Sequence, residues 1–131
     1  MGQRVRTAAP MGDWRTFTAE CVESGGHNQY DIIKIQDTVC VVYFEASVAY
    51  GDTFYPIYHC EKIMLTKLTG TGEAIVAGDK LYWSGVNGTG VSANYTSGWY
   101  WIAIATEDAA ADDETVEADL KGDKASLTEP L

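Results

Sequence analysis

The chain has 131 residues, the length of one ordinary domain, and 46% of them are apolar, enough for a hydrophobic core without metal ions or disulfides. Its 19 acidic residues outnumber 9 basic residues, and the formal net charge of −10 argues against nucleic acid as a partner. No apolar run approaches the roughly 20 residues of a membrane span and no signal peptide opens the sequence, so we expect no membrane partner and folding in a reducing cytosol.

The cysteine and histidine residues give no sign of a chemical site. Cys21, Cys40 and Cys60 are odd in number and too widely spaced for a disulfide framework, and the first two lie in apolar stretches typical of buried thiols. His27 and His59 are the only histidines, and no ligand pair has the short spacing of a zinc site. A Cys/His nucleophilic pair has no supporting motif either. We therefore predict no enzyme activity, no metal and no cofactor.

The two ends of the chain differ in composition from the middle. Residues 1–15 are basic and turn-rich without a sustained period, so we expect an arm that is disordered or ordered only on a partner. With a lead-in strand, this unit spans residues 1–24. We place the folded domain at residues 25–122 and a loose acidic tail at residues 123–131.

Between the ends, short runs rich in β-branched and aromatic residues alternate with glycine, asparagine or aspartate. Their spacing of about ten residues predicts an all-β fold, a single small β-barrel or β-sandwich-like domain, instead of alternating strands and helices. The expected strands cover residues 17–22, 30–35, 38–45, 53–58, 61–67, 80–84, 89–93 and 99–106, with a break near Pro56 and His59.

Residues 109–120 have two possible interpretations. Their alanine, glutamate and leucine content favours a helix, in which Val116 and Leu120 would lie about one turn apart. However, residues 115–121 also alternate, with Val116, Ala118 and Leu120 on one face and polar residues on the other. We favour the strand because the surrounding sequence is β.

An imperfect repeat accompanies the strands. Residues 48–55 recur as residues 76–82, one residue shorter, and residues 110–116 form a looser third copy without glycine. The turn residues of the first two copies are Gly51, Asp52, Gly78 and Asp79. Glycine tolerates a positive φ and aspartate can accept a hydrogen bond from a nearby amide, so each copy predicts a turn that leads into a strand. Chance similarity between short strands would give the same pattern.

The second copy opens a series of segments that occurs in a known family. Residues 72–83 carry an Ala-Gly-Asp turn that leads through an aliphatic residue to Tyr-Trp. A Gly/Thr/Asn-rich hairpin follows at residues 84–91, then an apolar strand at 101–105, then acidic residues and a closing strand at 109–121. In order and spacing the series resembles the small bacteriophage capsid decoration, or cement, proteins. The resemblance covers roughly residues 38–122.

The resemblance implies a β-barrel-like structural protein, without catalysis, on the outer surface of a phage head. Such proteins usually form homotrimers at three-fold or quasi-three-fold positions, where they clamp neighbouring subunits of the major capsid protein. The implied partners are therefore the major capsid protein and further copies of this chain, with synthesis and assembly in the host cytoplasm. Tyr- and Trp-rich strands suit this role, because they can bury aromatic surface on neighbouring subunits.

Two groups of side chains are candidates for these contacts. The positive charge of the N-terminal arm is separate from an acidic body, so we expect the arm to reach an acidic or apolar groove of the major capsid protein. Its contact residues would be Arg4, Arg6, Trp14 and Arg15. The second group is aromatic and consists of Tyr82, Trp83, Trp99, Tyr100 and Trp101.

Three explanations compete for the aromatic cluster Trp83, Tyr95, Trp99, Tyr100 and Trp101: packing in the core, a subunit interface, or a stacking platform for sugars. In an alternating strand, Trp99 and Trp101 would share one face and Tyr100 would take the other. Packing or an interface is the more common role of an aromatic stripe. The sugar platform corresponds to an alternative function, a carbohydrate- or cell-surface-binding module displayed on a virion.

Overall fold

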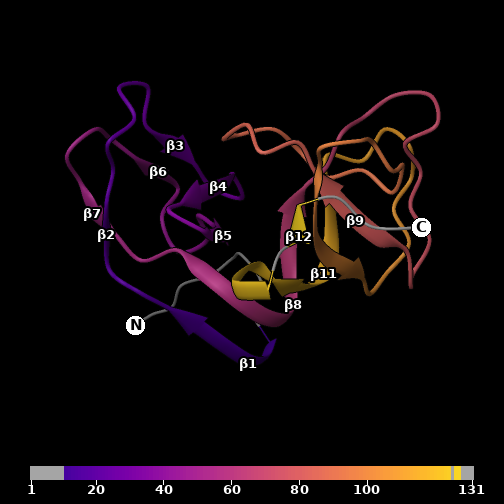
Figure 1. The fold of residues 1–131 in the computed structure, drawn as a ribbon, viewed down its shortest axis with the longest axis horizontal. Coiled ribbons are helices and arrows are strands. Elements are labelled where there is room, and N and C mark those ends of the chain that lie inside the picture. Colours follow the sequence, from indigo (N-terminus) through magenta and orange to yellow (C-terminus); the bar gives the residue numbers. More distant parts are fainter. Residues whose placement is uncertain (1–10, 125, 128–131) are drawn as a thin grey trace.

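The computed structural model describes residues 11–124 and 126–127, whose fold is shown in Figure 1. In this part of the chain every regular element is a strand except one 3-10 turn, so the all-β prediction is confirmed. The elements are β1 (Met11–Thr16), β2 (Ala19–Glu20), β3 (His27–Asn28), β4 (Ile32–Ile35), β5 (Thr38–Val41), β6 (Ser47–Val48), β7 (Thr53–Phe54), β8 (Ile57–Thr66), β9 (Lys80–Trp83), β10 (Tyr100–Ala105), β11 (Thr115–Lys121), η1 (Gly122–Lys124) and β12 (Ser126–Leu127).

One curled sheet forms most of the described molecule (Figure 1). Its strand order is β12-β10-β11-β8-β5-β4, with β1 added to β8 and β9 added to β10. Each pair of named strands is antiparallel. The two short pairs β2–β7 and β3–β6 form a second lobe beside the β4–β5 hairpin (Figure 1).

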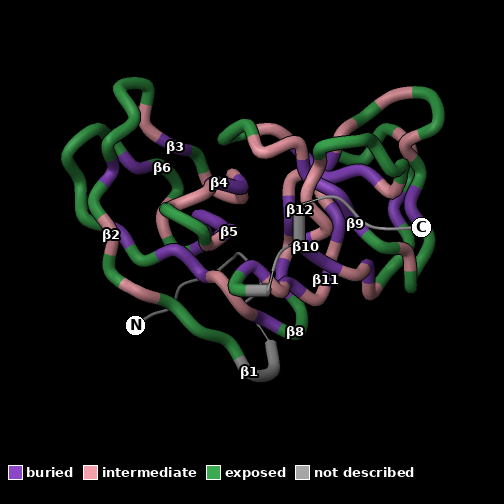
Figure 2. Tube along the Cα trace, in the orientation of Figure 1, coloured by how far each residue is buried: buried purple, intermediate pink, exposed green. Residues whose placement is uncertain are grey.

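The buried apolar side chains form two clusters, one on each side of the β4–β5 hairpin. Ile32 and Val41 belong to the larger cluster, whereas Ile33 and Cys40 belong to the smaller one. Neighbouring residues of a strand face opposite sides, and the register pairs Ile32 with Val41 and Ile33 with Cys40. Both faces of the hairpin are therefore covered, which explains its nearly continuous apolar sequence. Buried segments accordingly occur in both lobes (Figure 2).

Residues 115–121 form strand β11 and no helix. Val116, Ala118 and Leu120 are buried, and the residues between them are partly exposed. The strand lies between β8 and β10, so it completes the backbone hydrogen bonds of both neighbours. The strand interpretation is thus confirmed.

The strands expected at residues 17–22 and 38–45 are shorter in the structure, where they are limited to β2 and β5. Two further details of the strand prediction are wrong. The expected break near His59 is absent, and β8 continues through it, because His59 has register partners on both sides, Arg15 in β1 and Lys121 in β11. The expected strand at residues 89–93 is reduced to isolated bridges at Val91 and Ser92. Both differences depend on which distant segments are available for pairing.

The repeated segments fold into the same kind of turn. The side-chain Oδ2 of Asp52 accepts a hydrogen bond from the amide three residues earlier at 3.0 Å, and Asp79 and Asp113 do the same at 2.9 Å. Gly51 and Gly78 occupy the third turn position with φ of 90° and 95°. Asp52 and Asp79 directly precede β7 and β9, and Asp113 lies two residues before β11.

A fourth turn of this kind is not apparent in the sequence. The amide of Asn28 donates to Oδ2 of Asp31 at 2.8 Å, just before β4. Tyr30 takes the position that glycine occupies in the turns at Asp52 and Asp79, with φ of 72°. A non-glycine residue in this region carries backbone strain, and no local pattern marks it in advance.

Parts of both chain ends differ from the expected arm and tail. Met11–Thr16 forms β1 against β8, so this part of the predicted arm is a strand of the main sheet. Arg4 and Arg6 lie outside the described residues. Ser126 and Leu127, expected in the loose tail, form β12 and pair with β10.

Candidate functional site

The first two residues of the predicted aromatic group are buried. Trp83 lies in the larger core cluster, and its indole N–H donates to the carbonyl oxygen of Thr89 at 3.0 Å. The Tyr82 ring contacts that of Tyr95 at 5.5 Å between centroids. Trp83 and Tyr82 thus pack within the domain.

The other three residues of the group are half-buried. Trp99 lies just before β10 and so does not share a strand face with Trp101. The Lys80 ammonium lies 5.0 Å from the centroid of Trp101, and the Lys34 ammonium lies 5.0 Å from that of Tyr100. Lys34 also donates to the Tyr100 hydroxyl at 2.8 Å, which raises the pKa of the lysine. Lysines of the same chain therefore occupy part of the surface that a sugar would need for stacking.

A second set of aromatic side chains is exposed, and we call Trp14, Phe44 and Tyr55 the rim patch. Their exposed fractions are 42%, 49% and 47%. The rings of Trp14 and Phe44 lie 5.4 Å apart. The amide of Tyr55 donates to Oε2 of Glu45, the residue after Phe44, at 3.1 Å. Trp14 and Phe44 therefore form an exposed aromatic pair, and the Tyr55 backbone is hydrogen-bonded to the residue after Phe44.

Strand β1 sets the position of the rim patch. Its pairing with β8 places Trp14 opposite Cys60 and Arg15 opposite His59. Among the described residues, no strand pairs with the outer side of β1, which forms the edge of the sheet (Figure 1). An exposed edge strand with apolar side chains is a typical site of protein contact.

The far edge of the sheet, at β4, is covered by the chain itself. Oδ1 of Asn87 accepts a hydrogen bond from the Lys34 amide at 3.0 Å. The Gly88 amide donates to the carbonyl oxygen of Ile32 at 2.9 Å. The glycine-rich hairpin of residues 84–91 thus protects β4 as a neighbouring strand would. The edge at β4 is therefore covered by the hairpin, whereas the outer side of β1 has no partner strand among the described residues.

Only two of the four predicted arm residues lie in the described part of the chain. Trp14 and Arg15 are exposed on β1, and Arg4 and Arg6 lie outside the described residues. Phe44 and Tyr55 were not predicted as contact residues. Phe44 lies in an apolar run where alternation does not distinguish the exposed side, and only the folded chain places it beside Trp14.

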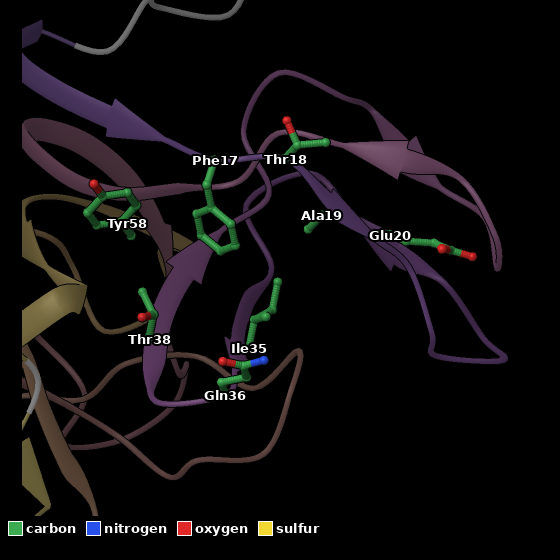
Figure 3. Close-up of a pocket in the computed structure, with 8 residues that line it drawn as sticks. All are labelled: Phe17, Thr18, Ala19, Glu20, Ile35, Gln36, Thr38 and Tyr58. Carbon is green, nitrogen blue, oxygen red and sulfur yellow. The ribbon is translucent and has the colours of Figure 1, made fainter.

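A pocket of about 510 Å³ lies between β2 and the turn of the β4–β5 hairpin, next to the end of β1 (Figure 3). Two aromatic residues, Phe17 and Tyr58, line one end, and their rings are 5.8 Å apart. The complete lining consists of Phe17, Thr18, Ala19, Glu20, Ile35, Gln36, Thr38 and Tyr58. The sequence gives no sign of this pocket, because its walls come from four separate strands and their connections.

No group of three or more His, Cys, Asp or Glu side chains is placed to hold a metal ion within residues 11–124 and 126–127. Cys21, Cys40 and Cys60 are buried, as expected for the first two, and burial raises the pKa of Cys40 to about 12. A thiol with so high a pKa is a poor nucleophile at neutral pH. No helix in the described part of the chain has the length and apolar character needed to cross a membrane.

A family model described as phage cement protein matches residues 13–120. The matched region begins within β1 and ends within β11, so it includes the rim patch, the pocket and both core clusters. No curated protein matches the chain.

Proposed function

Because the chain belongs to the phage cement protein family, we propose that it binds the outer surface of a phage head and clamps neighbouring subunits of the major capsid protein. The family places the protein in the virion, at the capsid, as a structural component. We propose further that it acts as a homotrimer at three-fold or quasi-three-fold positions. Three linked contacts would hold more strongly than one, because binding of the first raises the effective concentration of the others.

The rim patch on the sheet edge is the observation that carries this proposal. Trp14 and Phe44 are both close to half exposed, and their rings already contact each other. Aromatic side chains held in place before binding lose little conformational entropy when a partner covers them. The proposed contact surface is therefore the rim patch with Arg15. Arg4 and Arg6, which precede it in the sequence, are proposed as further contact residues.

The proposal is tested by co-sedimentation of the purified protein with undecorated heads of its parent phage, before and after shell expansion. We expect saturable binding that prefers expanded heads. Trp14→Ala and Phe44→Ala should each weaken binding by about tenfold or more, as for central aromatic residues of interfaces. Tyr50→Ala is the matched control, because Tyr50 is 68% exposed at the Ala49–Asp52 turn in the second lobe.

A truncation separates the arm from the edge strand. Removal of residues 1–10 leaves β1 intact, so the remaining protein should fold and bind heads less tightly. If binding is undiminished, Arg4 and Arg6 do not contribute to the contact with the phage head. Absence of binding by the full chain to either form of head would refute the clamping function, and a glycan array would then test the carbohydrate-binding alternative.

A further inference from the structure

The pocket at the end of β1 differs in chemistry from one end to the other. Figure 3 shows Phe17 and Tyr58 towards one end and the side chain of Glu20 at the other, with Ala19 and Ile35 between them. The apolar residues of the lining are partly buried against the smaller core cluster, whereas Glu20 is exposed. The pocket therefore has an aromatic and aliphatic wall, with the exposed Glu20 at its edge.

We propose that this pocket holds a basic side chain, arginine or lysine, from the major capsid protein; this inference rests on the proposed function. Such a side chain has an apolar stem that packs against rings and methyl groups and a charged head that remains near water. The stem would lie along Phe17 and Ile35, and the head would reach the Glu20 carboxylate.

Charge favours a cationic occupant. The lining contains one carboxylate and no lysine or arginine. Asp37, in the hairpin turn between the lining residues Gln36 and Thr38, is exposed and adds a second negative charge nearby. The chain as a whole carries a formal charge of −10, so its field also attracts cations and repels anions. An acidic or phosphorylated segment would meet repulsion at this site.

Position favours the capsid as the source of the side chain. Phe17 directly follows β1, and the Thr16 hydroxyl donates to the carbonyl oxygen of Pro56 at 2.6 Å, next to Tyr55 of the rim patch. The pocket therefore continues the proposed contact surface along the chain. One partner segment that covers the rim patch could place a basic residue in the pocket.

The chemistry of the pocket is tested with N-acetyl-arginine amide as the probe and the neutral N-acetyl-citrulline amide as its isosteric control. In proton–nitrogen NMR spectra of the full chain, the arginine compound should shift the amide signals of Thr18, Glu20, Gln36 and Thr38. Saturation on the order of millimolar is expected for so small a ligand. Equal effects of the two compounds, or no shifts at these residues, would overturn the proposal.

Three variants connect the pocket to the capsid. Glu20→Gln removes the charge, Thr38→Trp fills the pocket, and Glu23→Gln removes an exposed acid that does not line it. Glu20→Gln and Thr38→Trp should bind the arginine compound and the phage heads at least about threefold more weakly, the effect of a partly exposed charge pair. Glu23→Gln should behave as the unmodified protein.

The outcomes distinguish this inference from the proposed function. If the unmodified protein binds heads and both pocket variants bind them equally well, the capsid is not the source of the side chain, and the clamping function stands. If the unmodified protein fails to bind heads, the clamping function fails, whereas the arginine titration still decides the chemistry of the pocket.

Discussion

Replacement of Lys67 by methionine should destabilise the protein far more than replacement of a surface lysine. Lys67 is 3% exposed at the end of β8. Its ammonium donates to the carbonyl oxygens of Leu68, Ala110, Ala111 and Asp113 at 2.7, 3.1, 3.1 and 3.1 Å. An ammonium has three hydrogens, so four acceptors require at least one shared hydrogen bond. Lys67 thus fastens the third aspartate turn to the sheet.

The size of the effect follows from the groups left behind. Methionine fills similar space but donates no hydrogen bond, and each buried carbonyl without a partner costs about 1–3 kcal/mol. The carbonyl oxygens of Ala110 and Ala111 still accept hydrogen bonds from the amides of Asp113 and Gly70. The cost therefore falls on the carbonyl oxygens of Leu68, which is half-buried, and Asp113, which is exposed so that water can replace the ammonium. Removal of a buried charge also relieves a desolvation penalty and offsets part of the loss. We expect a net loss of about 1–2 kcal/mol in the free energy of unfolding.

Urea denaturation of Lys67→Met, beside Lys62→Met as the control, measures this loss. Lys62 is exposed in β8, the strand that Lys67 directly follows, so its replacement should change the free energy of unfolding by less than about 0.5 kcal/mol. Hydrogen exchange should also show faster exchange of the Ala110 and Asp113 amides in Lys67→Met, because their turn is no longer fastened. If the free energy of unfolding of Lys67→Met lies within about 0.5 kcal/mol of that of the unmodified protein, the four hydrogen bonds do not stabilise the fold and the reasoning is refuted.

Three further changes test other parts of the fold. Gly122→Ala would place a methyl group against the carbonyl oxygen of Val39, so urea denaturation should show a loss above about 3 kcal/mol, whereas Gly25→Ala, with open space around it, should cost much less. Asp79→Ala removes a hydrogen bond of 2.9 Å to a backbone amide and should lower the free energy of unfolding by about 1 kcal/mol, with Asp79→Asn closer to the unmodified protein. Burial raises the pKa of Cys40 from 9.0 to about 12, so the unfolded thiol ionises first and stability should fall as pH rises from 9.0 to about 12. Urea titrations across this range should show a shallower fall for Cys40→Ala, and an unchanged slope would contradict the assignment.

The sequence by itself determined the features that depend on neighbouring residues. The alternation of Val116, Ala118 and Leu120 specified a strand, because only a period of two buries all three side chains in the sheet. Likewise, the Gly-Asp pairs marked turns, since both the positive φ and the aspartate hydrogen bond are local. The order of these segments also led to the family that the comparison establishes.

Tertiary structure decided the features that join distant segments. Nothing in the sequence distinguishes Lys67 from other lysines. In the fold, its ammonium is covered by the turn at Ala110–Asp113 and donates hydrogen bonds to it. The rim patch exists because β1 pairs with β8 and brings Trp14 beside Phe44. The pocket depends on the gap between β2 and the β4–β5 turn. Periodicity and turn chemistry state which way a residue faces within its own strand, but not which strand lies next to it. That choice is made by the packing of the whole sheet, and it places the proposed contact residues together.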